Sequence, residues 1–210
     1  METTDFKCYM ISNKPEYYEQ VKLNILPYHL EFYDGTNIFS FASLVNSCVE
    51  QCPTEIIVMM SDKVMPTAYD VKKTIDLINQ GYGFVGLYLF SFFGFHKDLF
   101  RTVGPLDEKF VSGGYEDHDY YLRLRENNVS CYVSHEVKYF KRKSSYDYSI
   151  NKLYFIEKWI PNYSHRILFE NHMERRIPEI KNFRNFGEYK GTKFLPWDNK
   201  YVHSKVALPL

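Results

Sequence analysis

The sequence contains no long hydrophobic run, and no stretch approaches the roughly 18 apolar residues that a transmembrane helix requires. Its first residues, METTDFKCYMIS, lack the basic segment and the long apolar core of a secretory signal. These absences lead us to expect a soluble protein of the cytoplasm. The two Asn-x-Ser sequences, at Asn128 and Asn162, should then carry no glycan, because glycosylation requires a secretory route.

The sequence has only four cysteines, and their spacing argues against a CxxC motif and against a zinc site. The four cysteines, Cys8, Cys48, Cys52 and Cys131, form no CxxC pair and no spacing typical of zinc sites. We therefore expect reduced and mostly buried thiols.

The chain also lacks a net charge, which argues against broad binding to nucleic acid. The charges are nevertheless unevenly distributed, because residues 1–137 hold 11 Lys and Arg against 19 Asp and Glu, whereas residues 138–210 hold 15 against 7. The basic C-terminal third could receive an anionic ligand such as a pyrophosphate, or a polyanionic acceptor such as modified DNA. Equally, the two oppositely charged parts could simply attract each other.

The sequence does contain enough apolar residues to form a full-sized core, since 45% of its residues are hydrophobic and 18% are aromatic. The first 90 residues alternate short apolar runs with segments of helical spacing, which predicts an α/β fold with a mainly parallel central sheet flanked by helices. Ligands of such sheets bind outside the carboxyl ends of the strands, so the loops at 12–14, 34–37 and 61–63 should share one rim. The predicted strands are 6–12, 29–33, 55–60 and 84–90, and the predicted helices are 16–26, 39–52 and 67–79.

The later sequence is less regular. We expect a short helix at 96–103, a helix that ends near Asn127, strands at 130–134 and 137–140, and helices at 151–159 and 164–175. A single domain should result, with a core at 1–145 that divides into two halves near residue 90. Residues 146–210 should form a helical or irregular extension packed on this core.

The segment GGYEDHDYYLRL, residues 113–124, concentrates four ionisable side chains after two glycines. Gly113 and Gly114 would let the backbone approach a ligand closely, and acids in the first turn of a helix are stabilised by its dipole. The alternative is that the acids only cap the helix, with Asp119 paired to Arg123 four residues later. We favour that alternative for Asp119 and regard His118 as incidental. Consecutive helical residues point about 100° apart, so the four groups cannot all bind one metal ion.

Several segments in this order resemble inverting GT-A-fold glycosyltransferases that use nucleotide sugars. YMISNKPEYYEQ resembles the family's first strand and nucleotide-contacting turn, YDGTN its acidic turn, and EIIVMMSDKVMP its buried strand and metal motif. GFHKDLFRTVGPLDEKFVSGGYEDHDYYLRL resembles its acceptor-side stretch, and is especially similar to the Gly-Gly-Glu-Asp-Asp-Asp segment of β-1,4-galactosyltransferases. The resemblance covers roughly residues 6–145, and it implies a nucleotide-binding half at about 1–90 and an acceptor and catalytic half at about 91–145.

The resemblance implies a set of roles for individual residues. Asp117 matches the family's general base, which takes the proton from the acceptor hydroxyl, and Glu116 would hydrogen-bond a sugar. The nucleotide, most simply that of a UDP-sugar, would contact Ser12, Asn13 and Asp34. Further sugar or acceptor contacts would come from Gly94, Gly113, Gly114 and Tyr115. Beyond the resemblance, Tyr146, Tyr148, Trp159 and Trp197 are candidate stacking platforms for a sugar or a base.

The sequence departs from the family where the metal would bind. Ser61-Asp62-Lys63 stands where most members carry Asp-x-Asp, and Phe140-Lys141 stands where a metal-binding His often ends a strand. Hard divalent ions need several oxygen ligands, so we expect no obligatory metal, with Mn²⁺ or Mg²⁺ on Asp62 as the alternative. The diphosphate would then be neutralised by Lys63 together with Lys141, Arg142 and Lys143.

The leading hypothesis is therefore a transferase of a sugar from a nucleoside-diphosphate sugar to a glycan, protein or small-molecule acceptor, with inversion. One alternative is an inactive domain of the same fold that binds a nucleotide sugar or a glycan, because an eroded Asp-x-Asp is also typical of a degenerate enzyme. Lesser alternatives are the glycosylation of hydroxylated bases in DNA, and a phosphodiesterase or nuclease that uses the acidic cluster.

Overall fold

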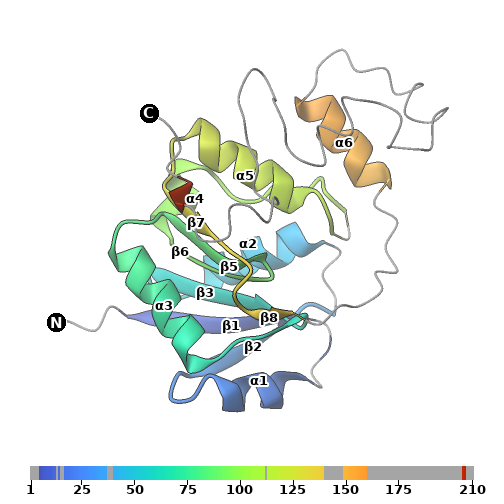
Figure 1. The fold of residues 1–210 in the computed structure, drawn as a ribbon. Helices are drawn as coiled ribbons and strands as arrows, with labels where there is room; N and C mark the ends of the chain where they lie inside the picture. The colour runs from blue at the N-terminus through green and yellow to red at the C-terminus, as the bar shows by residue number, and fades with distance from the viewer. Residues whose placement is uncertain are drawn as a thin grey trace.

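The computed structural model describes residues 5–12, 14, 17–36, 40–111, 113–139, 149–159 and 205–206. Its first part alternates strands and helices at nearly the predicted positions (Figure 1). The elements are β1 (Phe6–Ser12), α1 (Tyr18–Asn24), β2 (Leu30–Asp34), α2 (Phe41–Gln51), β3 (Ile56–Ser61), β4 (Val64–Met65) and α3 (Ala68–Asn79).

The second part completes the sheet and adds helices on one face of it. Its elements are β5 (Phe84–Phe90), β6 (Phe92–His96), α4 (Asp98–Thr102), α5 (Glu116–Glu126), β7 (Cys131–Val133), β8 (Lys138–Tyr139), α6 (Ser149–Trp159) and β9 (Lys205–Val206).

The central sheet has the strand order β2-β1-β3-β6-β5-β7-β9. Strands β1, β2, β3, β5 and β7 run in one direction, whereas β6 and β9 run against them. The predicted α/β class with a mainly parallel sheet flanked by helices is thus confirmed. The hairpin of β5 and β6 was not predicted, because LYLFSFFGF reads as one apolar run and its turn, around Ser91, contains neither Gly nor Pro.

Two apolar cores lie on opposite faces of this sheet, as the two-residue period of a strand requires. In β1, Tyr9 and Ile11 face the core shared with α2, α4, α5 and α6, whereas Cys8 and Met10 face the core shared with α1 and α3. Figure 1 shows the two sets of helices on the two sides of the sheet. Both faces of the strands are therefore covered, which explains why EIIVMM carries no polar alternation.

The helix starts are set by local chemistry. The Ser40 hydroxyl accepts a hydrogen bond from the backbone amide of Ser43 and caps α2, and Thr67 and Asp70 form a capping box at α3. Pro53 follows the end of α2, which it could not continue. These signals place the helices so that the start of α2 lies near the carboxyl ends of β1 and β3.

Within the predicted extension, α6 is the helix that the structure describes, and it packs on the core through Phe155 and Trp159. The predicted helix at 164–175 lies outside the described residues. All four cysteines are free and buried, as expected. Across the described part of the chain, no helix has both the length and the apolar character needed to cross a membrane.

Candidate active site

A cleft of about 490 Å³ opens at the edge of the sheet where β1, β3 and β5 end. Because β2 lies on one side of β1 and β3 on the other, the strand order reverses here, which is the position where open α/β sheets bind ligands. The strand ends form one wall, and the loop before α5 with the first turn of α5 forms the other. Of the predicted site residues, the cleft brings together Ser12, Asp62, Lys63, Gly113, Gly114, Tyr115, Glu116 and Asp117.

Two serines end neighbouring strands in the same way. The Ser12 hydroxyl accepts a hydrogen bond from the amide of Lys14 at 3.0 Å, and the Ser61 hydroxyl accepts one from the amide of Lys63 at 3.3 Å. Each bond turns the chain away from the sheet directly after the strand. Lys63, exposed at the tip of its turn, thereby reaches the cleft as a positive charge opposite the start of α5.

The acidic turn after β2 lies at the rim of the cleft rather than in it. Asp34 is exposed, and its Oδ1 accepts hydrogen bonds from the amide of Thr36 at 2.8 Å and from its hydroxyl at 2.5 Å, which lower the pKa of Asp34. The neighbouring Gly35 lines the cleft, where a Cβ would meet Leu44 at 3.0 Å. Asp34 therefore shapes the turn that Gly35 presents to the cleft.

Glu116 is almost fully enclosed, with 6% of its surface exposed. Burial raises the pKa of its carboxyl group to about 8, the negative charge of Asp117 adds to the effect, and the positive charge of Lys63 opposes it. Its Oε2 has no hydrogen-bond partner among the described residues. A carboxyl group of this kind is neutral at pH 7 and carries a proton that it can donate to a ligand.

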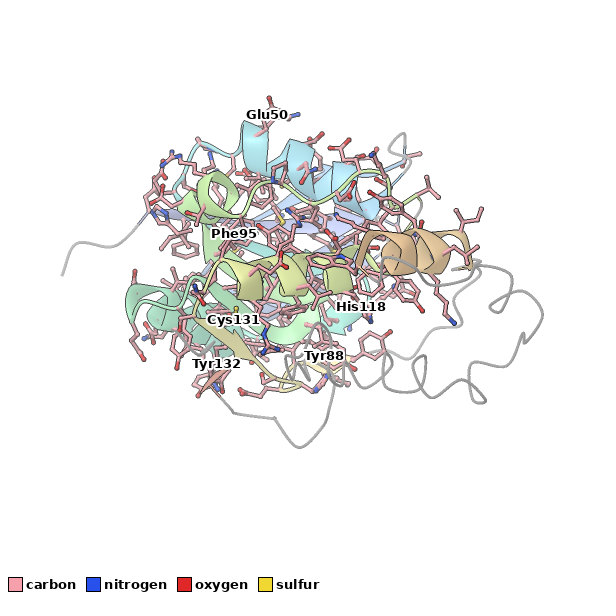
Figure 2. All side chains as sticks on the ribbon, turned by 90° about the horizontal axis from the view of Figure 1, so that it is seen from above. Glu50, Tyr88, Phe95, His118, Cys131 and Tyr132 are labelled. Carbon is pink, nitrogen blue, oxygen red and sulfur yellow. The ribbon has the colours of Figure 1, made fainter. Side chains whose placement is uncertain are left out.

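Asp117, the next residue, has a pKa that is shifted in the opposite direction. Burial alone would raise its pKa, but the charge of His118 and hydrogen bonds from the ring and the amide of His118 take the pKa below its usual value. Asp117 Oδ1 lies 2.6 Å from His118 Nδ1 and 2.8 Å from His118 N. His118 was expected to be incidental, but it lines the cleft and contacts Asp117, at the end of α5 nearest α6 (Figure 2).

Asp119 behaves as its helical spacing predicts. Its carboxylate is fully buried and accepts a hydrogen bond from Arg123 Nε at 3.0 Å, which confirms the pairing across one helical turn. It also accepts a bond from the indole of Trp159 at 2.8 Å and pairs with Lys158 at 2.6 Å. Trp159 is 5% exposed and does not line the cleft.

Gly94 also lies away from the cleft. A Cβ at this position would come within 2.6 Å of Thr74 Cγ2 and 3.0 Å of the carbonyl oxygen of Ile57. This glycine therefore allows α3 to pack closely on β6, and it does not line the cleft. The part of LYLFSFFGF that reaches the cleft is the β5–β6 turn, a few residues earlier, where Leu89 adopts a left-handed backbone with φ of 50°.

Other cleft residues were missed by sequence reasoning. Ser40 and Phe41 enter from the start of α2, and Phe90 and Ser91 enter from the β5–β6 turn, where the carbonyl oxygen of Ser91 accepts a bond from the amide of Ser61 at 2.9 Å. The capping signal at Ser40 could have been found from the serine before the apolar run. Asn13, Lys141, Arg142 and Lys143, and the stacking candidates Tyr146, Tyr148 and Trp197, lie outside the described residues.

A divalent metal fits the strand-end wall poorly. Asp62 supplies the one carboxylate among the described residues of that wall, and the two positions beside it are a serine whose hydroxyl accepts from the backbone and a lysine. A group that could hold a metal lies elsewhere among the described residues, where Glu55, His96 and Asp98 bring one ligand atom each within 4.8 Å of one another. It sits at the opposite end of β3, and Glu55 and Asp98 also contact Arg101.

The fold and the cleft together define an α/β protein with a ligand site at the carboxyl ends of its strands. No protein-family model and no curated protein matches the sequence. Among solved structures, the chain is similar to the catalytic domain of Drosophila β-1,4-galactosyltransferase 7 in complex with xylobiose, with 12% identity, a TM-score of 0.48, and coverage of 70% of this chain and 78% of that one.

A mutant of the same galactosyltransferase, in complex with manganese, UDP-Gal and xylobiose, gives 11% identity, a TM-score of 0.44, and coverage of 70% and 74%. Because both TM-scores lie below 0.5, these similarities do not by themselves assign an activity to this chain. The function has to follow from the residues of the cleft.

Proposed function

We propose that this protein is an inverting glycosyltransferase of the GT-A type that transfers a sugar from a UDP-sugar to an acceptor hydroxyl. The observation that carries the proposal is the pair of adjacent carboxyl groups on one wall of the cleft, whose pKa values are shifted in opposite directions. Environments that push two such pKa values apart separate a base from a proton donor. The facing wall supplies a cation and serine hydroxyls at the site where α/β sheets hold nucleotides.

Asp117 is the proposed base. It is ionised at neutral pH and 25% of its side chain is exposed, so a hydroxyl of the acceptor can reach it. As the acceptor oxygen bonds to the anomeric carbon, the bond from that carbon to the diphosphate oxygen breaks, and Asp117 takes the hydroxyl proton. Attack on the face opposite the leaving group inverts the anomeric configuration.

Glu116 is the proposed sugar-binding residue. Since its carboxyl group is neutral at pH 7, it can donate a hydrogen bond to a sugar hydroxyl without adding a second negative charge beside Asp117. The ligand would also provide a partner for Oε2, which has none among the described residues. Because Glu116 is more buried than Asp117, we assign it to the donor sugar rather than to the acceptor.

The leaving diphosphate is assigned to the strand-end wall. Lys63 provides a positive charge there, and Ser12 lies at the end of the neighbouring strand β1. Lys141, Arg142 and Lys143 remain proposed additional cations. Asp62 is the single carboxylate among the described residues of this wall, which supports a mechanism in which lysine and arginine, rather than a metal ion, stabilise the departing charge.

The test is the substitution Asp117→Asn, assayed with UDP-sugars and a panel of glycan, peptide and small-molecule acceptors. We expect kcat to fall by about 10²- to 10⁴-fold, because the general base is lost, while the affinity for UDP changes less than two-fold. The exposed Asp76→Asn on α3 is the matched control and should retain full activity.

An NMR measurement of the anomeric configuration of the product checks inversion. If the unmodified protein binds UDP-sugars but transfers nothing to any acceptor, it is a binding domain and the proposal is wrong. Activity retained by Asp117→Asn would show that another group is the base.

A further inference from the structure

The loop that presents Glu116 and Asp117 has an unfavourable backbone. Gly114 and Tyr115, the two residues before α5, both have positive φ angles, 98° and 72°. A left-handed tyrosine is strained, and such a conformation persists only where surrounding contacts enforce it. Tyr115 has no side-chain cap hydrogen bond to α5, so the contacts that hold the loop must come from elsewhere.

One side chain from a distant helix makes these contacts. Asn151, in the first turns of α6 and 2% exposed, accepts a hydrogen bond through Oδ1 from the amide of Val111 at 3.0 Å. Its Nδ2 donates to the carbonyl oxygens of Val111 at 2.7 Å, Gly113 at 3.1 Å and Gly114 at 2.9 Å. Three carbonyl oxygens around one end of the amide require the nitrogen there, which fixes its orientation.

Asn151 is itself held in place by the rest of α6. The buried ring of Phe155, one turn later, packs 5.5 Å from the ring of Tyr115 and 6.1 Å from that of His118. At the next turn Lys158 pairs with Asp107 at 2.7 Å and with Asp119 at 2.6 Å. These contacts tie α6 to both ends of the segment that carries the carboxyl pair.

We propose that Asn151 is a positioning residue, which holds the strained backbone at Gly114 and Tyr115 so that Asp117 meets the acceptor hydroxyl in the correct place. This positioning role rests on the proposed function, because the position of Asp117 matters only if its carboxylate takes part in the reaction. The nucleotide-side residues Ser12 and Lys63 lie at the ends of β1 and β3, whereas the hydrogen bonds of Asn151 go to Val111, Gly113 and Gly114. Substitution of Asn151 should therefore lower kcat while leaving the affinity for the donor nucleotide nearly unchanged.

The first experiment compares Asn151→Ala and Asn151→Asp with the unmodified protein. We expect kcat to fall 10- to 100-fold in Asn151→Ala, since displacements of about 1 Å have effects of this size, while the dissociation constant of UDP changes less than two-fold. Asn151→Asp has the same shape but cannot donate to three carbonyl oxygens, so its kcat should fall further.

The matched control is Asn46→Ala. Asn46 on α2 also braces a loop, since its Nδ2 donates to the Leu106 carbonyl at 2.9 Å and to Glu108 at 2.8 Å, and its Oδ1 accepts from the Leu106 amide at 2.9 Å. It does not line the cleft. We expect a comparable drop in melting temperature with kcat unchanged. Equal losses of kcat in both variants, or an Asn151→Ala enzyme of full activity, would overturn the positioning role.

Hydrogen exchange gives a second readout that needs no activity. The Val111 amide bonds directly to Asn151, so its exchange should accelerate at least 10-fold in Asn151→Ala and remain unchanged in Asn46→Ala. If no transfer is found but this exchange accelerates, the proposed function fails and the loop brace stands. If transfer is found and the exchange is unaffected, the brace is wrong and the enzyme assignment survives.

Discussion

Glu116 and Asp117 are neighbours in the chain, yet their carboxyl groups lie in opposite electrostatic surroundings. Glu116 is buried beside the cleft, whereas the carboxylate of Asp117 lies against the ring and amide of His118. The difference arises because successive helical residues point about 100° apart, so one of the pair can be buried while the other meets a partner. At the residue scale, the site therefore combines one carboxyl group whose pKa is raised with one whose pKa is lowered.

The raised pKa of Glu116 predicts a pH-dependent stability. Between its ordinary value of 4.5 and its folded value of about 8, the native protein keeps a proton that the unfolded chain releases. The free energy of unfolding therefore decreases as the pH rises through this window. In Glu116→Gln this contribution is absent, so the variant should gain melting temperature relative to the unmodified protein, from little at pH 4.5 to roughly 3 °C or more at pH 8.5.

Thermal unfolding followed by circular dichroism at several pH values measures this difference. Glu19→Gln, a substitution of an exposed residue of α1, is the control and should show a difference that does not depend on pH. A Glu116→Gln variant that parallels the unmodified protein across the whole range would mean that Glu116 is ionised in the folded state.

Residue roles were predictable where they depend on local spacing. The pairing of Asp119 with Arg123 follows from a four-residue separation on one helix, and it is present. The Asp117–His118 contact was not foreseen, because side-chain rotamers decide it. The interior role of Trp159 was also missed, since it depends on where α6 docks, 40 residues further along the chain.

At the scale of elements, α5 is anchored by one buried carboxylate. Asp119 is fully buried and bonds to Arg123, Trp159 and Lys158, so its removal leaves the Arg123 charge without its main partner. We expect Asp119→Ala to lower the free energy of unfolding by about 3 kcal/mol. Urea unfolding measures this change.

The pair of Lys72 and Asp76 on α3 has the same four-residue spacing but is exposed. Asp76→Ala should therefore cost only about 0.5 kcal/mol, and it serves as the matched control for Asp119→Ala. If the free energy of unfolding fell by similar amounts in the two variants, burial would not make the Asp119 contacts more stabilising than an exposed ion pair.

The packing of α3 on β6 allows a prediction for Gly94. A methyl group there would meet Thr74 and the Ile57 carbonyl at less than normal contact distances, so Gly94→Ala should destabilise the protein by about 1–3 kcal/mol. The affinity for UDP should not change, which isothermal titration calorimetry can verify. A selective loss of sugar binding with normal stability would instead place Gly94 at the donor.

Elements were mostly foreseen, because periodicity marks a strand or a helix locally. Phe84–Phe90 matches its predicted strand, and α2 and α3 differ from prediction by one or two residues. The β5–β6 hairpin escaped prediction because its turn lacks a turn-type residue pair and because tertiary packing, rather than local propensity, folds the aromatic run back on itself.

At the scale of the whole molecule, the cleft depends on segments that meet only through the sheet. The rim shared by the ends of β1 and β3 follows from parallel topology, and sequence alone indicated it. The facing wall, with the start of α5 against these ends, required the three-dimensional structure. No pattern in the sequence states how a helix crosses a sheet.

A thermal-shift panel of nucleoside diphosphates tests the strand-end wall. UDP at 100 times its dissociation constant should raise the melting temperature by roughly 5 °C or more, with the same shift in excess chelator. Lys63→Ala should weaken UDP binding at least about 10-fold, since one charge-assisted contact is lost. A shift that disappears with chelator and returns with Mn²⁺ would show that Asp62 holds a metal.

The contact between Asn151 and loop 111–114 also has a consequence for biosynthesis. The strands that form the strand-end wall are translated first, and the carboxyl pair of Glu116 and Asp117 is translated next. Asn151 follows Asp117 by about 35 residues. A nascent chain that has not yet added α6 already contains the described residues of both walls but has no brace for the strained loop. Under the proposed function, the nascent chain would therefore be able to bind a donor before it could transfer the sugar.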